Sequence, residues 1–507
     1  MRPASIAQSV PSVEASAKWY VLPIFLAIFC LCYAAVLFIP YGFLDDYTIF
    51  ANLGIKRERE LKTLMLAGGR PLQVVWSESL FPLLSTIGDL RYIRFLSVVT
   101  IAFLAWSIWR TLVSVGWEKD AAFFLSVIMC TTPPFQVYAA WATAGFCPLA
   151  ALMAGGAWRV AEYAYREQRP LHRLSLATGA VSCLFGALLL YQPAAMFFWV
   201  FAAVMLFKPE TTWSDVGRRL WWYGVVCAAG LLSAFVVYKI GIALHGNFLP
   251  PQRATVAHDV TEKAIWFLKG PLRDALNAIR FPSKRAVAIG VAIFILGGFP
   301  LYLYGTFRER LSLCMTALAL LPCSYLPNLV VAENWSSYRT QSALTSLIVL
   351  YGFFALNGYV KIFARAPSPQ LLTRGIGVAA LLSCLLAAWN VSVYFAIPQY
   401  RELTILRDQL AQFEMTQVTG LAIRCAHGEE GLAPRRRYDE FGTPSTALAW
   451  TPGPMAYLLL RELGVRHAET LQVEVLKADA PFVSSPGVRM IDMGQLLGEY
   501  RQKLGRR

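Results

Sequence analysis

Charged residues are scarce in this chain, and the scarcity decides its broad class. Only 15% of the 507 residues are charged, whereas 57% are hydrophobic and the mean hydropathy is +0.49. A soluble protein carries about a quarter charged residues, so the composition predicts a polytopic membrane protein. Basic residues exceed acidic ones by 46 to 31, which gives a net charge of +15. In a membrane protein such an excess belongs to cytoplasmic loops and to contacts with anionic membrane lipid.

Motifs for metal, disulfide and nucleic-acid binding are also missing. The sequence has no CxxC pair and no HExxH element, and its five histidines are scattered, so a zinc site has no support. Nine of the ten cysteines lie in apolar stretches, and Cys425 is alone in the polar tail. No nucleic-acid motif accompanies the positive charge. We therefore expect no nucleic-acid partner and no certain cofactor, with a divalent cation left open.

Hydrophobic runs, in contrast, recur along most of the chain. A transmembrane helix needs about 20 mostly apolar residues, and the sequence predicts eleven such spans. They lie at 19–40, 93–114, 120–138, 143–163, 175–190, 192–207, 220–243, 286–305, 311–331, 341–361 and 375–397. The predicted fold class is an all-α polytopic membrane domain over 1–397 with a small α/β domain over 398–507.

Lysine and arginine set the expected orientation of these spans. With a cytoplasmic N-terminus, the cytoplasmic connections hold Arg110, Lys119, Arg159, Arg166, Arg169, Arg173, Lys208, Arg218, Arg219, Arg308, Arg310, Lys361, Arg365 and Arg374. The short connections on the other side, near 139–146, 191 and 332–338, hold none. We therefore expect a multi-pass protein of the bacterial inner membrane. Its periplasmic segments are then the loops 41–92 and 244–285 and the C-terminal domain.

The first outer loop is too long for a simple hairpin connection. Its residues 50–66 place charged and apolar side chains on different faces of a helix, which predicts an amphipathic helix lying on the bilayer. A Gly-Gly turn, Arg70 and Pro71 then lead into a second helix that ends near Pro82. Two such helices directly after the first span would frame a cavity.

The other outer segments carry weaker patterns. Residues 262–281 are amphipathic, which suits either a helix anchored at the headgroups or a flap over a lipid-linked substrate. In the tail, strands are predicted at 419–425, 471–476 and 488–491, with a helix over 453–463. The charged run 435–440 is either a phosphate site or a solvated loop.

Two adjacent aspartates follow the first span. Asp45 and Asp46 stand at the mouth of a transmembrane helix, where carboxylates are costly to desolvate and usually serve a site. Paired acids can supply a general base or bind a cation. Aspartate is also a favoured N-cap, so one of the two has an alternative structural role. We predict both as catalytic candidates and leave open which one is the base.

Other polar residues gather at the outer ends of the spans. A double proline at 133–134 breaks the third span and frees backbone groups that only a cavity or a neighbour can satisfy. The candidate substrate-binding residues are Arg70, Tyr138, Tyr191, Gln192, Glu333, Tyr338 and Arg339. Structural alternatives stay open for Tyr191 and Gln192, at a tight turn, and for Glu333, as a partner of Arg339.

Acids, arginines and aromatic residues beside a bilayer suit the transfer of a sugar from a polyprenyl phosphate. The headgroup of such a donor emerges at the membrane surface. A carboxylate can deprotonate the acceptor hydroxyl for in-line attack on the anomeric carbon. An arginine can hold the leaving phosphate and offset its developing charge, while aromatic rings stack on the sugar.

The order of these motifs resembles the GT-C superfamily of membrane glycosyltransferases. A Leu-Asp-Asp-Tyr motif at 44–47 follows the first span, a Gly-Arg-Pro-Leu motif at 69–72 lies in the long outer loop, and a Tyr-Gln pair stands at 191–192. Within the superfamily, the chain most resembles the bacterial O-antigen glucosyltransferases. The resemblance covers about residues 1–400. It implies inverting transfer, metal-independent or metal-assisted, from an undecaprenyl-phosphate sugar to a periplasmic glycan, lipid or protein.

Two other classes remain as alternatives. A transporter or flippase for a lipid-linked substrate usually shows internal repeats and polar groups near the membrane midplane, whereas this chain has no convincing repeat and places its acids at one face. A polysaccharide polymerase or ligase usually carries its main outer loop later in the chain. The large loop directly after the first span favours the glycosyltransferase.

Overall fold

The computed structural model describes most of the chain. The described residues are 19–505 except 55–57, 209–210, 246–250, 278–284, 364–368, 435–438 and 482–485. Parts of three predicted segments, namely 50–66, 262–281 and 435–440, therefore lie outside the described residues.

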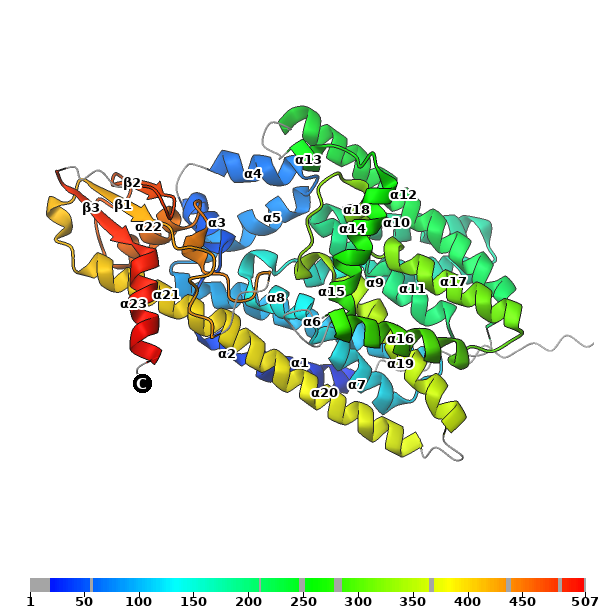
Figure 1. Ribbon diagram of the computed structural model, residues 1–507. Helices are drawn as coiled ribbons and strands as arrows, with labels where there is room; N and C mark the ends of the chain where they lie inside the picture. The colour runs from blue at the N-terminus through cyan, green and yellow to red at the C-terminus, as the bar shows by residue number, and fades with distance from the viewer. Residues whose placement is uncertain are drawn as a thin grey trace, which may run out of the picture.

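Long helices form one elongated bundle (Figure 1). Its helices are α1 (Leu22–Cys32), α2 (Ala34–Phe38), α6 (Leu90–Ser114), α7 (Lys119–Cys130), α8 (Pro133–Ala140), α9 (Cys147–Arg166), α10 (Pro170–Ala195), α11 (Phe198–Leu206), α12 (Trp213–His245), α16 (Arg285–Tyr302), α17 (Phe307–Cys323), α18 (Leu326–Val330), α19 (Ser342–Phe363) and α20 (Pro369–Val391). Within the described residues, seven helices are long and apolar enough to cross a membrane, or up to eight if the bent pair α7–α8 is one span. The predicted all-α membrane class is confirmed.

The sixth predicted span did not form as expected. Helix α10 continues to Ala195, and only Tyr191 leaves helical geometry, with φ −158° and ψ 106°. The predicted turn at 191–193 is therefore a kink inside one helix. The following α11 has nine residues, all buried. At 1.5 Å per residue it spans about 14 Å, which is less than half of a hydrocarbon core of about 30 Å.

The double proline does break the third predicted span. Helices α7 and α8 meet at an angle of 62°. The side-chain amide of Gln136 donates a 2.8 Å hydrogen bond to the Thr131 carbonyl, and the Asn390 amide donates to Gln136 Oε1 at 3.1 Å. A carbonyl at the break is thus satisfied by neighbouring side chains, as the sequence predicted.

Close helix contacts in the bundle depend on glycine. A Cβ atom added to Gly358 of α19 would overlap the carbonyl oxygen of Gly298 in α16 and lie 2.7 Å from the backbone nitrogen of Tyr302. Small residues at such crossings let two helix backbones approach. This crossing therefore has no room for a methyl group.

Replacing Gly358 with alanine is expected to destabilise the bundle. Overpacking of this kind costs about 1–3 kcal/mol, because α16 and α19 must separate. Gly352→Ala on the same helix is the matched control, since its added Cβ would meet open space. Thermal unfolding in detergent should show a lower midpoint for Gly358→Ala alone; equal midpoints for the two variants would contradict the packing argument.

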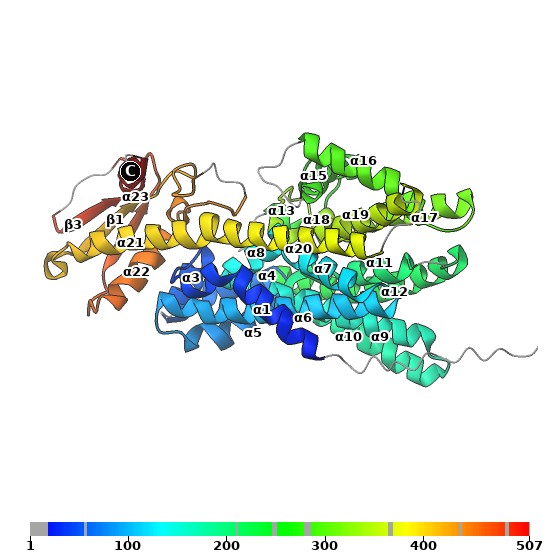
Figure 2. The ribbon, with the colours of Figure 1, turned by 90° about the horizontal axis from the view of Figure 1, so that it is seen from below.

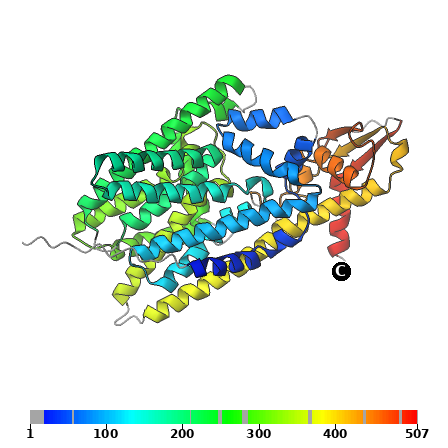
Figure 3. The ribbon, with the colours of Figure 1, turned by 180° about the vertical axis from the view of Figure 1, so that it is seen from behind.

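The outer loops fold into short helices at one end of the bundle. They are α3 (Asp45–Gly54), α4 (Glu58–Ala67), α5 (Pro71–Leu80), α13 (Pro251–Ala254), α14 (Val260–Lys269) and α15 (Pro271–Leu276). The described part of the predicted helix 50–66 belongs to α3 and α4. In Figure 3, α4 and α5 lie between the bundle and the C-terminal domain. These helices therefore cover the end of the bundle that faces that domain.

The C-terminal domain extends from a continuous helix. Helix α20 passes through a π-helical turn, Ser392–Ala396, into α21 (Ile397–Ala411), and Figure 2 shows this helix running from the bundle to the domain. Strands β1 (Gly420–Arg424), β2 (Gln472–Leu476) and β3 (Val488–Asp492) form a parallel sheet in the order β2-β1-β3, with helices α22 (Pro452–Glu462) and α23 (Met493–Gly505). The predicted strands, helix and α/β class are confirmed.

Candidate active site at the outer end of the bundle

Asp46 is a buried acid that organises the start of α3. Its side chain is fully buried, and its Oδ1 accepts hydrogen bonds from the backbone nitrogen and the hydroxyl of Thr143, both at 2.6 Å. Its Oδ2 accepts from the backbone nitrogens of Phe43, at 3.0 Å, and Ala142, at 3.4 Å. Three of these four donors belong to the connection between α8 and α9, so they tie the loop after the first span to that connection. This arrangement favours the structural alternative for Asp46.

Asp45 is half-buried and has fewer partners. Its Oδ1 accepts a 3.0 Å hydrogen bond from the indole nitrogen of Trp450, and its charge acts on the guanidinium of Arg339. The preceding residue, Leu44, has φ 46°, and its backbone nitrogen donates to Ser445 Oγ at 3.0 Å. Such a conformation costs a non-glycine residue roughly 1–3 kcal/mol. Contacts from the C-terminal domain therefore help to hold Asp45 in its orientation.

Arg70 lies directly before α5 on a turn that Gln192 secures. Gly69 adopts φ +69°, and the Gln192 amide donates to the carbonyls of Gly68 at 3.1 Å and Gly69 at 3.3 Å. The guanidinium stands 5.4 Å from the centre of the Tyr191 ring. Arg70 Nε is buried without a hydrogen-bond partner, and Arg70 forms no ion pair with another of the described residues. Gln192 therefore secures the turn that carries a cation without an anionic partner among the described residues.

Arg339 is held by aromatic rings. Its guanidinium lies 4.5 Å from the ring centre of Trp141 and 4.6 Å from that of Trp335. Tyr138 donates its hydroxyl to the Arg339 carbonyl at 2.5 Å, so it acts on the backbone of this arginine. Tyr338 packs its buried ring against Phe441, with ring centres 5.6 Å apart. Both predicted tyrosines thus support Arg339 from within the protein.

Glu333 does not pair with Arg339, and that predicted alternative is wrong. Its carboxylate accepts two hydrogen bonds from Arg253 Nε, at 2.8 and 2.9 Å. The cause is a short antiparallel contact between two outer segments, with an isolated bridge between Val256 and Val331. That contact places Arg253 beside Glu333.

Three guanidinium groups act on one another at this end of the molecule. Burial lowers the pKa of Arg70, and the positive charges of Arg253 and Arg339 lower it further. The Arg253 charge is balanced by Glu333. A concentration of positive charge with little water around it attracts an anion strongly. The arrangement is therefore suited to a phosphate group.

Several residues at the site were not predicted from the sequence. Trp141 and Trp335 flank Arg339, while Ser445, Trp450 and Glu440 reach the site from the C-terminal domain. The sequence did carry signals for some of them: Trp141 and Trp335 stand in the outer connections 139–146 and 332–338, where aromatic rings were expected, and Glu440 ends the charged run 435–440, a candidate phosphate site. Its basic residues 435–437 lie outside the described residues, and its acidic end contacts Arg339.

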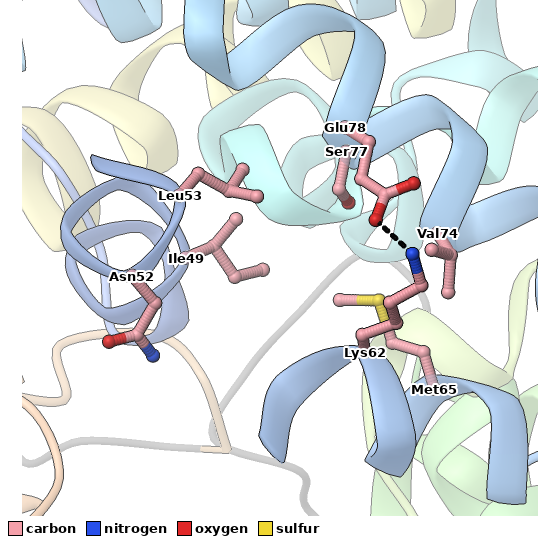
Figure 4. Close-up of a pocket in the computed structure, with 8 residues that line it drawn as sticks. All are labelled: Ile49, Asn52, Leu53, Lys62, Met65, Val74, Ser77 and Glu78. Atoms are coloured by element: carbon pink, nitrogen blue, oxygen red, sulfur yellow. Dashed lines mark hydrogen bonds and ion pairs between the residues drawn. The ribbon is translucent and has the colours of Figure 1, made fainter. Parts of the chain in front are cut away.

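A pocket between the outer helices lies apart from these residues. Figure 4 shows its lining from α3, α4 and α5: Ile49, Asn52, Leu53, Lys62, Met65, Val74, Ser77 and Glu78. Lys62 and Glu78 form an ion pair of 2.6 Å across it. The pocket contains none of the predicted site residues. We therefore place the candidate active site at Asp45, Arg70 and Arg339.

The described residues also bear on the divalent cation that the sequence leaves open. No group of three or more His, Cys, Asp or Glu side chains gathers among them in a way that could hold a metal ion.

Asp46 should give the protein a specific pH dependence. Burial raises the pKa of its carboxyl to about 6, although hydrogen bonds from Thr143 and the charge of Arg94 lower it. An unfolded aspartate has a pKa of about 3.9, so the folded state loses stability as the pH rises from about 4 to 6. The loss approaches about 3 kcal/mol.

Thermal unfolding between pH 4 and pH 8 tests this dependence. Relative to Asp46→Asn, the wild type should lose stability across that window, because asparagine does not titrate. Asp120→Asn, at an exposed aspartate, should follow the wild type. Parallel pH profiles for the wild type and Asp46→Asn would contradict the raised pKa.

Comparisons with known proteins identify the family of the chain. A sequence model of the family described as glucosyl transferase GtrII matches residues 34–356, which is more than half of the chain. No curated protein sequence matches. A crystal structure of an Archaeoglobus fulgidus oligosaccharyltransferase, described as a complex with Zn and sulfate, is similar with a TM-score of 0.41 and 13% identity. The match covers 80% of this chain and 60% of that one.

Proposed function

The chain belongs to the GtrII glucosyl transferase family, and we propose that it moves a hexose from a polyprenyl-phosphate donor to a periplasmic surface-glycan acceptor. It is thus a membrane glycosyltransferase whose donor, acceptor and base are our assignment. One observation carries the proposal: a half-buried carboxylate, Asp45, shares one end of the bundle with the partly buried side chains of Arg70 and Arg339.

Asp45 is the proposed general base. It takes the proton of the acceptor hydroxyl as that oxygen forms a bond to the anomeric carbon of the sugar. The bond from the anomeric carbon to the phosphate oxygen breaks, and polyprenyl phosphate leaves with the bonding electrons. Attack opposite the leaving group inverts the anomeric configuration. Asp45 suits this role better than Asp46, whose oxygens already accept four hydrogen bonds.

Arg70 and Arg339 are the proposed phosphate-binding residues. A guanidinium can donate two parallel hydrogen bonds to phosphate, and charge that develops on the leaving group is stabilised most in a site with little water. Arg70 has an unpartnered buried nitrogen, which fits a ligand oxygen. Trp141 and Trp335 keep the Arg339 guanidinium in place, and the ring of Trp335, which is partly exposed, is available to a sugar.

The distribution of basic residues between the two ends of the bundle supports an orientation of the protein in the membrane. Helix α9 begins at Cys147 and α10 ends at Ala195, and both of these residues lie at the end of the bundle that holds the site. Arg166, where α9 ends, and Pro170, where α10 begins, lie at the opposite end. Most predicted basic connections belong to that opposite end. We propose an inner-membrane protein with a cytoplasmic N-terminus, a periplasmic active site and a periplasmic C-terminal domain.

A transfer assay with the purified full-length protein tests the proposal. Polyprenyl-phosphate glucose carrying a radioactive sugar is supplied in lipid vesicles together with a lipid-linked glycan acceptor. We expect labelled acceptor and free polyprenyl phosphate in equal amounts. A nucleotide sugar supplied instead should give no product. Movement of the intact donor between leaflets, without cleavage, would instead support the flippase alternative.

A further inference from the structure

A segment of the C-terminal domain reaches into the proposed active site. We call residues 439–450 the strap. The Gly442 backbone nitrogen donates to the Tyr394 carbonyl at 3.1 Å, and Gln399 donates its amide to the Thr443 carbonyl at 2.7 Å. The buried ring of Phe441 packs against Phe395, with ring centres 4.9 Å apart. The fold therefore fixes where the strap meets the bundle.

The carboxylate of Glu402 anchors the middle of the strap. It accepts hydrogen bonds from the backbone nitrogens of Ser445, at 3.0 Å, and Thr446, at 2.7 Å. Ser445, at this anchor, contacts Leu44, and Trp450, five residues later, contacts Asp45. Before it, Glu440 lies beside Arg339. One segment thus touches both the proposed base and a proposed phosphate ligand.

The contact between Glu440 and Arg339 is a loose one. Glu440 is 6% exposed, and its Oε1 lies 3.6 Å from Arg339 Nε. Hydrogen bonds between such ions normally measure about 2.7–2.9 Å. Among the described residues, Arg339 Nε has no hydrogen-bond partner, and Glu440 also interacts with the adjacent carboxyl of Asp439. The two charges therefore neutralise each other without optimal geometry.

A second buried carboxyl, that of Asp439, lies next to Glu440. The adjacent carboxyl of Asp439 is buried, and it accepts a 2.6 Å hydrogen bond from the backbone nitrogen of Tyr338. Burial and the charge of Glu440 raise the pKa of Asp439 well above its usual range. An Asp439 carboxyl with so high a pKa keeps its proton and carries no charge, so Arg339 is the cation beside the Glu440 carboxylate among the described residues, and an anion that bound Arg339 would compete with that carboxylate.

We propose that Glu440 is an internal counter-ion that occupies Arg339 until the phosphate of the donor replaces it. The inference rests on the proposed function, since it takes Arg339 as a phosphate ligand. A phosphate and a carboxylate cannot both stay within ion-pair distance of one guanidinium without repelling each other. A phosphate can also accept two parallel hydrogen bonds from one guanidinium. The 3.6 Å contact between Glu440 and Arg339 does not have that geometry. Donor binding therefore moves Glu440 away from Arg339 and couples the strap to the site.

Inhibition by polyprenyl phosphate tests the exchange in the full-length protein. Glu440→Gln removes the competing charge while keeping the shape of the side chain. We expect its inhibition constant for polyprenyl phosphate, and its KM for the donor, to fall by about threefold to tenfold, with kcat within about twofold. Glu474→Gln, at an exposed residue of β2, is the matched control and should behave as wild type. A merely structural role for Glu440 would not tighten phosphate binding.

Three other results would overturn the proposal. Loss of kcat in Glu440→Gln with an unchanged inhibition constant would make Glu440 part of the catalytic machinery and overturn the proposal. If that variant does not fold, Glu440→Asp draws the carboxylate back and should lower the inhibition constant about twofold; an unchanged or higher constant overturns the proposal. Wild-type protein that polyprenyl phosphate does not inhibit would overturn the donor assignment itself, and the inference with it.

Discussion

Asp45→Asn is expected to lower the rate of sugar transfer by roughly 100- to 10,000-fold. That range is the usual contribution of a positioned general base, and asparagine cannot accept the proton. The hydrogen bond from Trp450 to Oδ1 is retained by an amide oxygen, so the loop should keep its structure. The donor KM should change little, because Asp45 acts on the acceptor. Initial rates over a range of donor concentrations separate the two effects.

Two controls give this result its meaning. Asp120→Asn changes an exposed aspartate in the first turn of α7, and it should leave the transfer rate unchanged. Asp46→Asn should instead lower stability, because it disturbs the bonds to Thr143. Full activity in well-folded Asp45→Asn would exclude Asp45 as the base. Loss of activity in Asp46→Asn with normal stability would transfer the role to Asp46.

Local patterns in the sequence predicted the elements of the fold well. The strands at 420–424, 472–476 and 488–492 appeared where short apolar runs were bounded by turn residues. The double proline broke its helix because proline cannot continue the backbone ladder. The kink at Tyr191 was misread as a turn, since a proline two residues later permits either structure. Burial by neighbouring helices decided between them, and a hydropathy pattern does not contain that information.

The sequence predicted which types of residue make up the candidate site, but it did not predict which of them form ion pairs with one another. Asp45 and Arg70 were candidates because a charged side chain at the end of a membrane span is costly to desolvate and usually serves a functional site. Glu333 was expected beside Arg339, six residues away, yet it pairs with Arg253. Pairings of that kind depend on contacts between distant segments. The role of Glu440 was hidden for the same reason, since a different domain brings it to Arg339.

Arg70→Gln is expected to raise the KM for the donor roughly tenfold to 100-fold. A hydrogen bond to a charged group contributes about 1.5–3 kcal/mol, and every 1.4 kcal/mol changes affinity about tenfold. Arg70→Lys should recover part of the loss, because it keeps the charge but not the two-pronged geometry. Arg91→Gln, at an exposed arginine beside Tyr92, should change nothing. The measurement is the donor KM and the inhibition constant of polyprenyl phosphate for each variant.

Gln192→Ala separates the charge of Arg70 from its position. The variant keeps the guanidinium but removes the donor to the Gly68 and Gly69 carbonyls, so the turn before α5 is less firmly held. Its donor KM should rise less than that of Arg70→Gln, and added salt should still weaken donor binding, because the cation remains. If Arg70→Gln bound the donor normally while Gln192→Ala did not, the turn itself would be the binding element. The kink at Tyr191 would then serve the backbone of the outer loop, and the phosphate would belong to Arg339 alone.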